Sequence, residues 1–64
     1  MKMTEDDIAL GAAMMLLRRH GDGAAVWVAE RIGELALAGD QEGVLFWKRI
    51  ALKMDQILRS GAVH

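Results

Sequence analysis

Few residues of this sequence carry side chains that could do covalent chemistry, and those few stand apart. The chain has no cysteine and no tyrosine, and its hydroxyl groups belong to Thr4 and Ser60, near opposite ends. The two histidines, His20 and His64, are also far apart. Nucleophilic catalysis needs a hydroxyl or thiol beside a base, and no local pattern supplies that pair. We therefore expect no catalytic residues, no enzymatic activity and no cofactor.

Two short patterns resemble ligand sites but lack the partners that such sites require. The Gly-Asp-Gly stretch at 21–23 could begin a phosphate loop, but that fingerprint needs a third glycine where Val26 stands, and a preceding strand. A calcium loop needs further oxygen ligands at alternating positions, and the alanines that follow provide none. Glu30 and Glu34 could share a cation, but a di-metal bundle would also require Glu-x-x-His motifs. We predict no metal site.

A group of basic residues in the C-terminal third makes the best case for nucleic-acid binding. The group consists of Lys48, Arg49, Lys53 and Arg59. Two helices joined by a short turn, with the second in the major groove, would form a helix-turn-helix. Against this, the formal net charge is -1, and the basic helix lacks Asn, Ser and Thr for reading base edges. A small DNA-binding regulator is therefore our alternative interpretation, and nucleic acid is not the partner that we favour.

Helices must position these residues, because no stretch alternates with the period of a strand. The apolar spacing predicts an all-α, compact three-helix domain, with helices at about 5–20, 23–38 and 41–59. The short connections predict that neighbouring helices pack roughly antiparallel. We expect residues 1–64 to form this single domain, with frayed ends at 1–3 and 60–64.

Capping residues mark the expected helix ends. Thr4 begins a capping-box pattern, with an aspartate in place of the usual glutamate. Gly21 and Gly39 are expected to end the first two helices, because glycine adopts the left-handed conformation easily. Asp22 and Asp40 follow these glycines and are predicted to cap the next helices.

Helical spacing sorts the apolar residues into expected faces. The first helix carries two stripes on nearly opposite sides, namely Ile8, Ala12 and Met15, and Leu10, Met14 and Leu17. The expected core stripe of the second helix is Ala25, Val28, Ile32, Leu35 and Ala36. That of the third is Val44, Trp47, Ile50, Ala51, Met54, Ile57 and Leu58. Trp47 is therefore predicted to be a core residue.

The chain has more apolar residues than its small interior can easily bury. Apolar residues make up 53% of the 64 residues before the seven glycines are added, whereas a typical domain has about 45–50% with its glycines included. A domain of this size is marginally stable without a disulfide, a metal or oligomerisation. Without cysteine or a cluster of histidines, the remaining support is oligomerisation or very good helix packing. We predict a homo-oligomer, with a dimer favoured.

Large apolar residues outside the core stripes indicate where contact would occur. Trp27 has charged residues at the i+3, i+4 and i+7 positions, so we expect it to be exposed and to serve contact rather than folding. The predicted contact residues are Trp27, Leu45 and Leu52, joined by Leu10, Met14 and Leu17 if the first helix faces outward. We expect the protein to act through protein–protein interaction, most of all self-association.

The apolar run at 8–17 does not have the features of a targeting or membrane segment. Acidic residues stand directly before it, where a signal peptide has basic ones. Ten apolar residues are too few to cross a bilayer, which takes about 20 in a helix. We therefore expect a cytoplasmic protein with no membrane contact.

The stretch ERIGELALAGDQEGVLFWKRIALKMDQI resembles a group of short, uncharacterised bacterial all-helical proteins. Their pattern, A-G-D-x-x-G followed by a Trp and a basic residue, falls on Ala38, Gly39, Asp40, Gly43, Trp47 and Lys48. The resemblance covers the C-terminal half of the chain most clearly. It implies a small stand-alone helical protein, and it implies no catalytic or ligand-binding residues. The same stretch is similar to one tetratricopeptide unit, but such repeats need about three copies.

Overall fold

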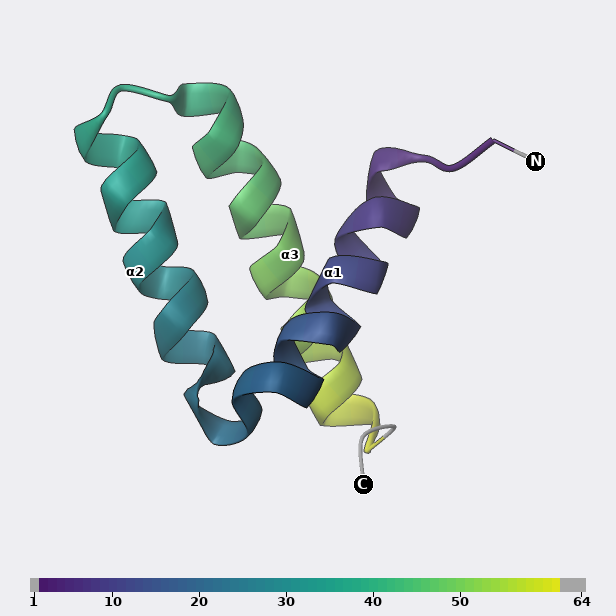
Figure 1. Ribbon diagram of the computed structural model, residues 1–64. Helices are drawn as coiled ribbons and strands as arrows, with labels where there is room; N and C mark the ends of the chain where they lie inside the picture. The colour runs from purple at the N-terminus through teal and green to yellow at the C-terminus, as the bar shows by residue number, and fades with distance from the viewer. Residues whose placement is uncertain (1, 62–64) are drawn as a thin grey trace.

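The computed structural model describes residues 2–61, which form α-helices joined by short turns (Figure 1). The helices are α1 (Glu5–His20), α2 (Ala24–Leu37) and α3 (Gln41–Ser60), with a 3-10 turn, η1 (Gly21–Gly23), between the first two. No strand occurs among these described residues, so the expected all-α class is confirmed. The expected frayed ends fall in part on 1 and 62–64, outside the described residues, whereas Ser60 belongs to α3.

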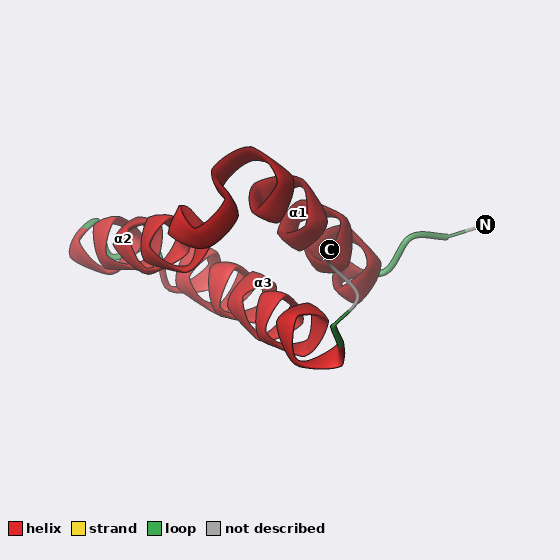
Figure 2. Ribbon diagram, turned by 90° about the horizontal axis from the view of Figure 1, so that it is seen from below, coloured by secondary structure: helices red, strands yellow, loops and turns green. Residues whose placement is uncertain are grey.

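The central element of the fold is α3, which packs against both other helices. α2 runs antiparallel beside α3, and α1 crosses α3 on another side (Figures 1 and 2). α1 and α2 share a much smaller contact, close to the turn that joins them. The molecule measures 35 × 32 × 17 Å, and its thickness is less than two helix diameters of about 10 Å each. Each helix therefore keeps an outward face that no other helix covers.

Small alanines bring α1 close to α3. Ala9 and Ala13 are fully buried, and Leu16 and Leu17 lie beside them. The remaining buried residues are Ala24 and Val28 of α2 and Ile50, Met54 and Ile57 of α3.

Neither stripe expected on α1 lies wholly inside or wholly outside the fold. Leu10 and Met14 are exposed while Leu17 of the same stripe is buried, and Ile8 and Met15 are exposed while Ala12 packs against the core. Residues 8–17 contain no polar side chain that could set the rotation of the helix, and close packing through the alanines sets it instead.

The expected faces of α2 and α3 are closer to the structure. Val28, Ile50, Met54 and Ile57 are buried as predicted. On α2, however, the first buried residue is Ala24 rather than Ala25, which is exposed. Ala36 and Leu58 are also exposed, because they lie at the margins of their stripes in a flat molecule. Trp47 is partly buried and packs against the core.

The start of α1 has the predicted capping box. The backbone N–H of Asp7 donates to Thr4 Oγ1, and the backbone N–H of Thr4 donates to Asp7 Oδ2, each over 3.1 Å. These bonds satisfy two of the amides that a helix start leaves without an intrahelical partner. Gly21 ends the helix with φ 54°, a left-handed value that glycine adopts without strain.

The two Gly-Asp pairs of the sequence behave differently. Asp40 caps α3 as predicted, because its Oδ1 accepts a hydrogen bond of 2.9 Å from the backbone N–H of Gly43. A Cβ at Gly43 would lie only 2.5 Å from Asp40 Oδ2, so the glycine leaves room for the capping carboxylate. Asp22 was also predicted to be a cap, and this is wrong: it lies within η1, and the start of α2 has no side-chain cap.

Candidate interaction surface

α1 presents a continuous apolar face to solvent on the side away from the core. Ile8, Leu10, Met14 and Met15 are between 40% and 54% exposed. Gly11 lies among them, about 160° or more around the helix from the buried alanines at 100° per residue. The run without polar side chains therefore covers both the buried side and the solvent side of one helix.

The predicted contact residue Leu17 does not belong to this surface. Only 7% of Leu17 is exposed, and it is part of the core cluster. Leu10 and Met14 do lie on the outer face, as predicted for an outward-facing first helix. Sequence reasoning missed Ile8 and Met15, which were placed in the stripe opposite Leu10 and Met14 and were not among the predicted contact residues. The available signal was that large apolar residues lie on both sides of Gly11. Two opposite stripes of one helix cannot both be buried in a flat molecule, so one of them had to face solvent.

Trp27 lies between aromatic rings rather than among charged groups alone. Its ring stacks on His20 at a centroid distance of 5.0 Å, and it lies 5.5 Å from the Trp47 ring at a tilt of 46°. The guanidinium carbon of Arg31 lies 5.9 Å from the centroid of Trp47, within the range of cation–π attraction. These contacts connect the end of α1 with α2 and α3.

The expectation that Trp27 is off the core and serves contact only is thus revised. Trp27 is 39% exposed, so one side of the ring is available to a partner while the other side packs within the chain. The reason is the shifted phase of α2: measured from Ala24 and Val28, the residue points sideways toward α3 and not outward. The His20 contact had no signal in the sequence, since it depends on how η1 turns the chain.

Trp27 and Trp47 also line an open hollow of about 430 Å³ together with Glu30, Arg31 and Glu34. Arg31 Nη1 lies 3.4 Å from Glu34 Oε1, so a cation of the chain belongs to the lining of the hollow beside the carboxylate. Aromatic faces beside carboxylates attract cations. In this hollow the cation is Arg31 of the chain itself, which lies near the Trp47 ring and Glu34.

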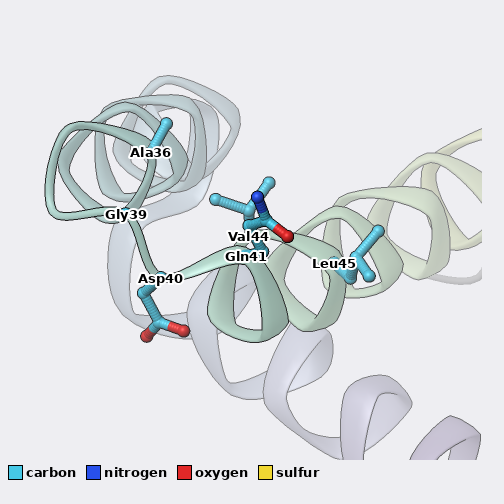
Figure 3. A pocket seen from close by; sticks show the side chains of 6 residues that line it. All are labelled: Ala36, Gly39, Asp40, Gln41, Val44 and Leu45. Atoms are coloured by element: carbon cyan, nitrogen blue, oxygen red, sulfur yellow. The ribbon is translucent and has the colours of Figure 1, made fainter.

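The other two predicted contact residues, Leu45 and Leu52, are exposed on α3 as expected. Leu45 borders an open hollow of about 390 Å³ at the turn between α2 and α3, where Ala36 and Gly39 face the first turns of α3 (Figure 3). The hollow is lined mainly by apolar atoms. Leu45, Leu52 and Trp27 thus lie on different helices from Leu10 and Met14.

The four predicted nucleic-acid residues do not form one free basic face. Arg49 Nη1 lies 2.8 Å from Asp6 Oδ1, and Arg49 Nη2 lies 3.6 Å from Glu5 Oε2. Lys53 Nζ lies 3.9 Å from Asp6 Oδ2, so both cations point toward the start of α1.

The remaining two basic residues differ from each other. Arg59 pairs with Asp55 one turn earlier, at 2.9 Å, whereas Lys48 is exposed and makes no ion pair with the described residues. Three of the four predicted cations thus have a carboxylate partner within the chain.

The described residues show no arrangement for metal chemistry or membrane crossing. No three His, Cys, Asp or Glu residues among 2–61 come together in a way that could hold a metal ion. No helix within the same range is both long enough and apolar enough to cross a membrane. The exposed face of α1 therefore remains the most distinctive feature of the surface.

A comparison with protein families supplies one match. The model of a family described as "Family of unknown function (DUF6961)" matches residues 6–61, which include all of α2 and α3 and nearly all of α1. No curated protein and no solved structure matches the chain.

Proposed function

This chain belongs to that family of unknown function, and we propose that it acts by binding another protein and not by catalysis. The observation that carries the proposal is the outer face of α1, where four large apolar side chains surround an exposed glycine. Leaving such a face in water forgoes about 25 cal/mol for each Å² of apolar surface. A contiguous apolar surface of this kind marks a site of interaction.

The partner that we favour is a second copy of the chain, in the cytoplasm. Large exposed apolar residues also occur on α2 and α3. Three of them are candidate contact residues in addition to Leu10 and Met14, namely Trp27, Leu45 and Leu52. A chain of 64 residues without cysteine gains stability when association covers such residues. Self-association thus accounts for both the apolar excess and the small size.

The ion pairs weigh against the alternative of DNA binding. A basic helix binds DNA by releasing counterions from phosphates, and a cation already held by a carboxylate contributes less to this exchange. Arg49 and Lys53 both lie beside Asp6. We therefore keep protein–protein interaction as the proposed function.

Light scattering after size exclusion tests self-association directly. We expect a mass near twice the 7.0 kDa of one chain at micromolar concentration, with a shift toward the single-chain mass on dilution. Met14→Glu should move the equilibrium toward monomer, and Leu37→Glu, at an exposed residue near the end of α2, is the matched control. A mass of one chain at every concentration would contradict the proposal of self-association. Salt-sensitive binding of the chain to duplex DNA would support the alternative instead.

A further inference from the structure

The outer face of α1 ends in opposite charges. Asp7, Gly11, Met14 and Arg18 lie on one line along the helix, because their spacings of four, three and four residues return to nearly the same direction at about 100° per residue. Asp7 is at the N-terminal end of this line and Arg18 is at the C-terminal end, and both are exposed. An apolar line with one acidic end and one basic end is complementary to itself only when a second copy runs in the opposite direction.

We propose that a second copy of this chain covers the outer face of α1, with the two α1 helices antiparallel about a two-fold axis midway along the helix. This inference rests on the proposed self-association and adds its geometry. In this register Asp7 faces Arg18 of the second copy at both ends of the contact. Gly11 faces Met14 of the second copy.

Neither of these two charges forms an ion pair with the described residues, although Asp7 Oδ2 accepts the backbone N–H of Thr4 in the capping box. Glu5 and Asp6, the other acidic residues in the first turn of α1, lie beside Arg49. At the opposite end His20 stacks on Trp27, whereas Arg18 makes no ion pair with the described residues. A parallel arrangement would bring like charges together at both ends. Charge complementarity therefore selects the antiparallel arrangement.

Gly11 supplies the second argument for this register. Glycine is among the poorest residues for the interior of a helix, and a Cβ at position 11 would meet nothing within 4 Å in the chain itself. Folding of the single chain thus gives no reason for a glycine there. Opposite a Met14 side chain, however, the missing Cβ leaves space into which the long and flexible side chain fits.

The exposed area of the chain agrees with one missing partner. A folded monomer of 7.0 kDa exposes about 4,000 Å² according to the usual scaling with mass, whereas this chain exposes 4878 Å². Residues 2–4, which precede α1 and are exposed, contribute part of the difference. The excess that remains is therefore at most about the 800 Å² that each partner buries in a standard interface.

Charge-reversed variants test the register. Asp7→Lys alone and Arg18→Glu alone each place two pairs of like charges in the antiparallel homodimer, so we expect each to associate at least about tenfold more weakly than the parent. An equimolar mixture of the two variants restores both pairs in a heterodimer. Sedimentation equilibrium should therefore show the mixture to associate about tenfold or more tightly than either variant alone. Asp7→Lys also removes the carboxylate of the capping box, so circular dichroism and urea unfolding check that each variant is folded at the concentrations compared.

The outcomes separate this inference from the proposed function. If the parent dimerises and the mixture shows no gain over the single variants, the antiparallel register is wrong while self-association stands. If the parent is monomeric at every concentration, self-association and the register both fail. If the mixture recovers the affinity of the parent, the register is established.

A glycine pair gives an independent test that does not depend on charge. Gly11→Leu should raise the resistance of the single chain to urea and weaken association by about tenfold or more, because the added side chain keeps the two α1 helices apart. Gly33→Leu is the control, since Gly33 is also exposed within a helix and a Cβ there meets nothing within 4 Å. It should raise resistance to urea to a similar degree and leave association unchanged. Equal association of both variants and the parent would overturn the proposed contact.

Discussion

The rings of Trp27 and Trp47 lie 5.5 Å apart at a tilt of 46° and join α2 to α3. A tilted pair at this distance is worth about 0.5–1.5 kcal/mol beyond the area it buries. We expect a double-mutant cycle of Trp27→Leu and Trp47→Leu, measured by urea unfolding at a fixed protein concentration, to give a coupling energy in that range. Trp47→Leu should lower the free energy of unfolding more than Trp27→Leu, because Trp47 packs against the core.

The result of this cycle decides which role Trp27 has in the single chain. Additive effects of the two substitutions would contradict the ring contact. If Trp27→Leu leaves the free energy of unfolding unchanged, Trp27 does not stabilise the single chain, and its role is contact with a partner. Trp27→Phe is the control, because it keeps an aromatic ring on α2.

The two Gly-Asp pairs predict opposite results for the same substitution. Asp40→Ala removes the side-chain acceptor of the Gly43 N–H and should lower the free energy of unfolding by about 1 kcal/mol, the usual value of an N-cap. Asp22→Ala should change the free energy of unfolding by less than about 0.5 kcal/mol, because Asp22 lies within η1 and does not cap α2. Urea unfolding of both variants checks this. Equal losses would show that Asp22 also caps a helix.

These caps show what the sequence can predict and where it stops. A capping box and a Gly-Asp-x-x-Gly corner are local, since the chemistry and the space that they need come from residues within four positions. The same dipeptide at 21–22 failed because a second glycine follows, and the chain forms a 3-10 turn there. Local patterns therefore predicted the ends of the helices better than the way in which one helix joins the next.

The rotation of α1 could not be predicted because it is set by residues distant in sequence. Between 8 and 17 every side chain is apolar or absent, so amphipathicity gives no direction. The direction comes from close packing at Ala9 and Ala13 and from the approach of Asp6 to Arg49. The partners of Arg49 and Lys53 could not be predicted for the same reason, since Asp6 lies more than forty positions earlier in the chain.

The capping box predicts a dependence of stability on acid. The backbone N–H of Thr4, and then its side chain, hydrogen-bond to the Asp7 carboxylate and hold its pKa below the ordinary value of 3.8. Because the folded pKa is lower than the unfolded one, the contribution to stability is present above about pH 4 and is lost as the pH falls through the folded pKa.

Urea unfolding between pH 5 and 2 measures this contribution. The free energy of unfolding of Asp7→Asn should fall less steeply in this range than that of the parent, because the variant has no carboxylate to protonate at that position. Thr4→Ala should have a smaller effect, since it removes the side-chain part of the box and leaves the backbone N–H that hydrogen-bonds to the carboxylate. Parallel pH profiles for the parent and Asp7→Asn would contradict the lowered pKa.

The last prediction concerns the ion pair between Asp6 and Arg49, which connects the start of α1 with α3. Both side chains are about half exposed, so water and salt screen the attraction, and pairs of this kind contribute about 0.2–1 kcal/mol. A double-mutant cycle of Asp6→Asn and Arg49→Gln should give a coupling energy in this range at low salt. At about 1 M salt, where the screening length is about 3 Å, the coupling should fall by half or more.

The local pair of Arg59 with Asp55 is the control: its cycle should give about 0.3–0.5 kcal/mol, and its loss should leave the docking of α1 unchanged. A coupling of zero for Asp6 and Arg49 at low salt would show that Arg49 is free, and the basic face of α3 would then again be open to phosphate.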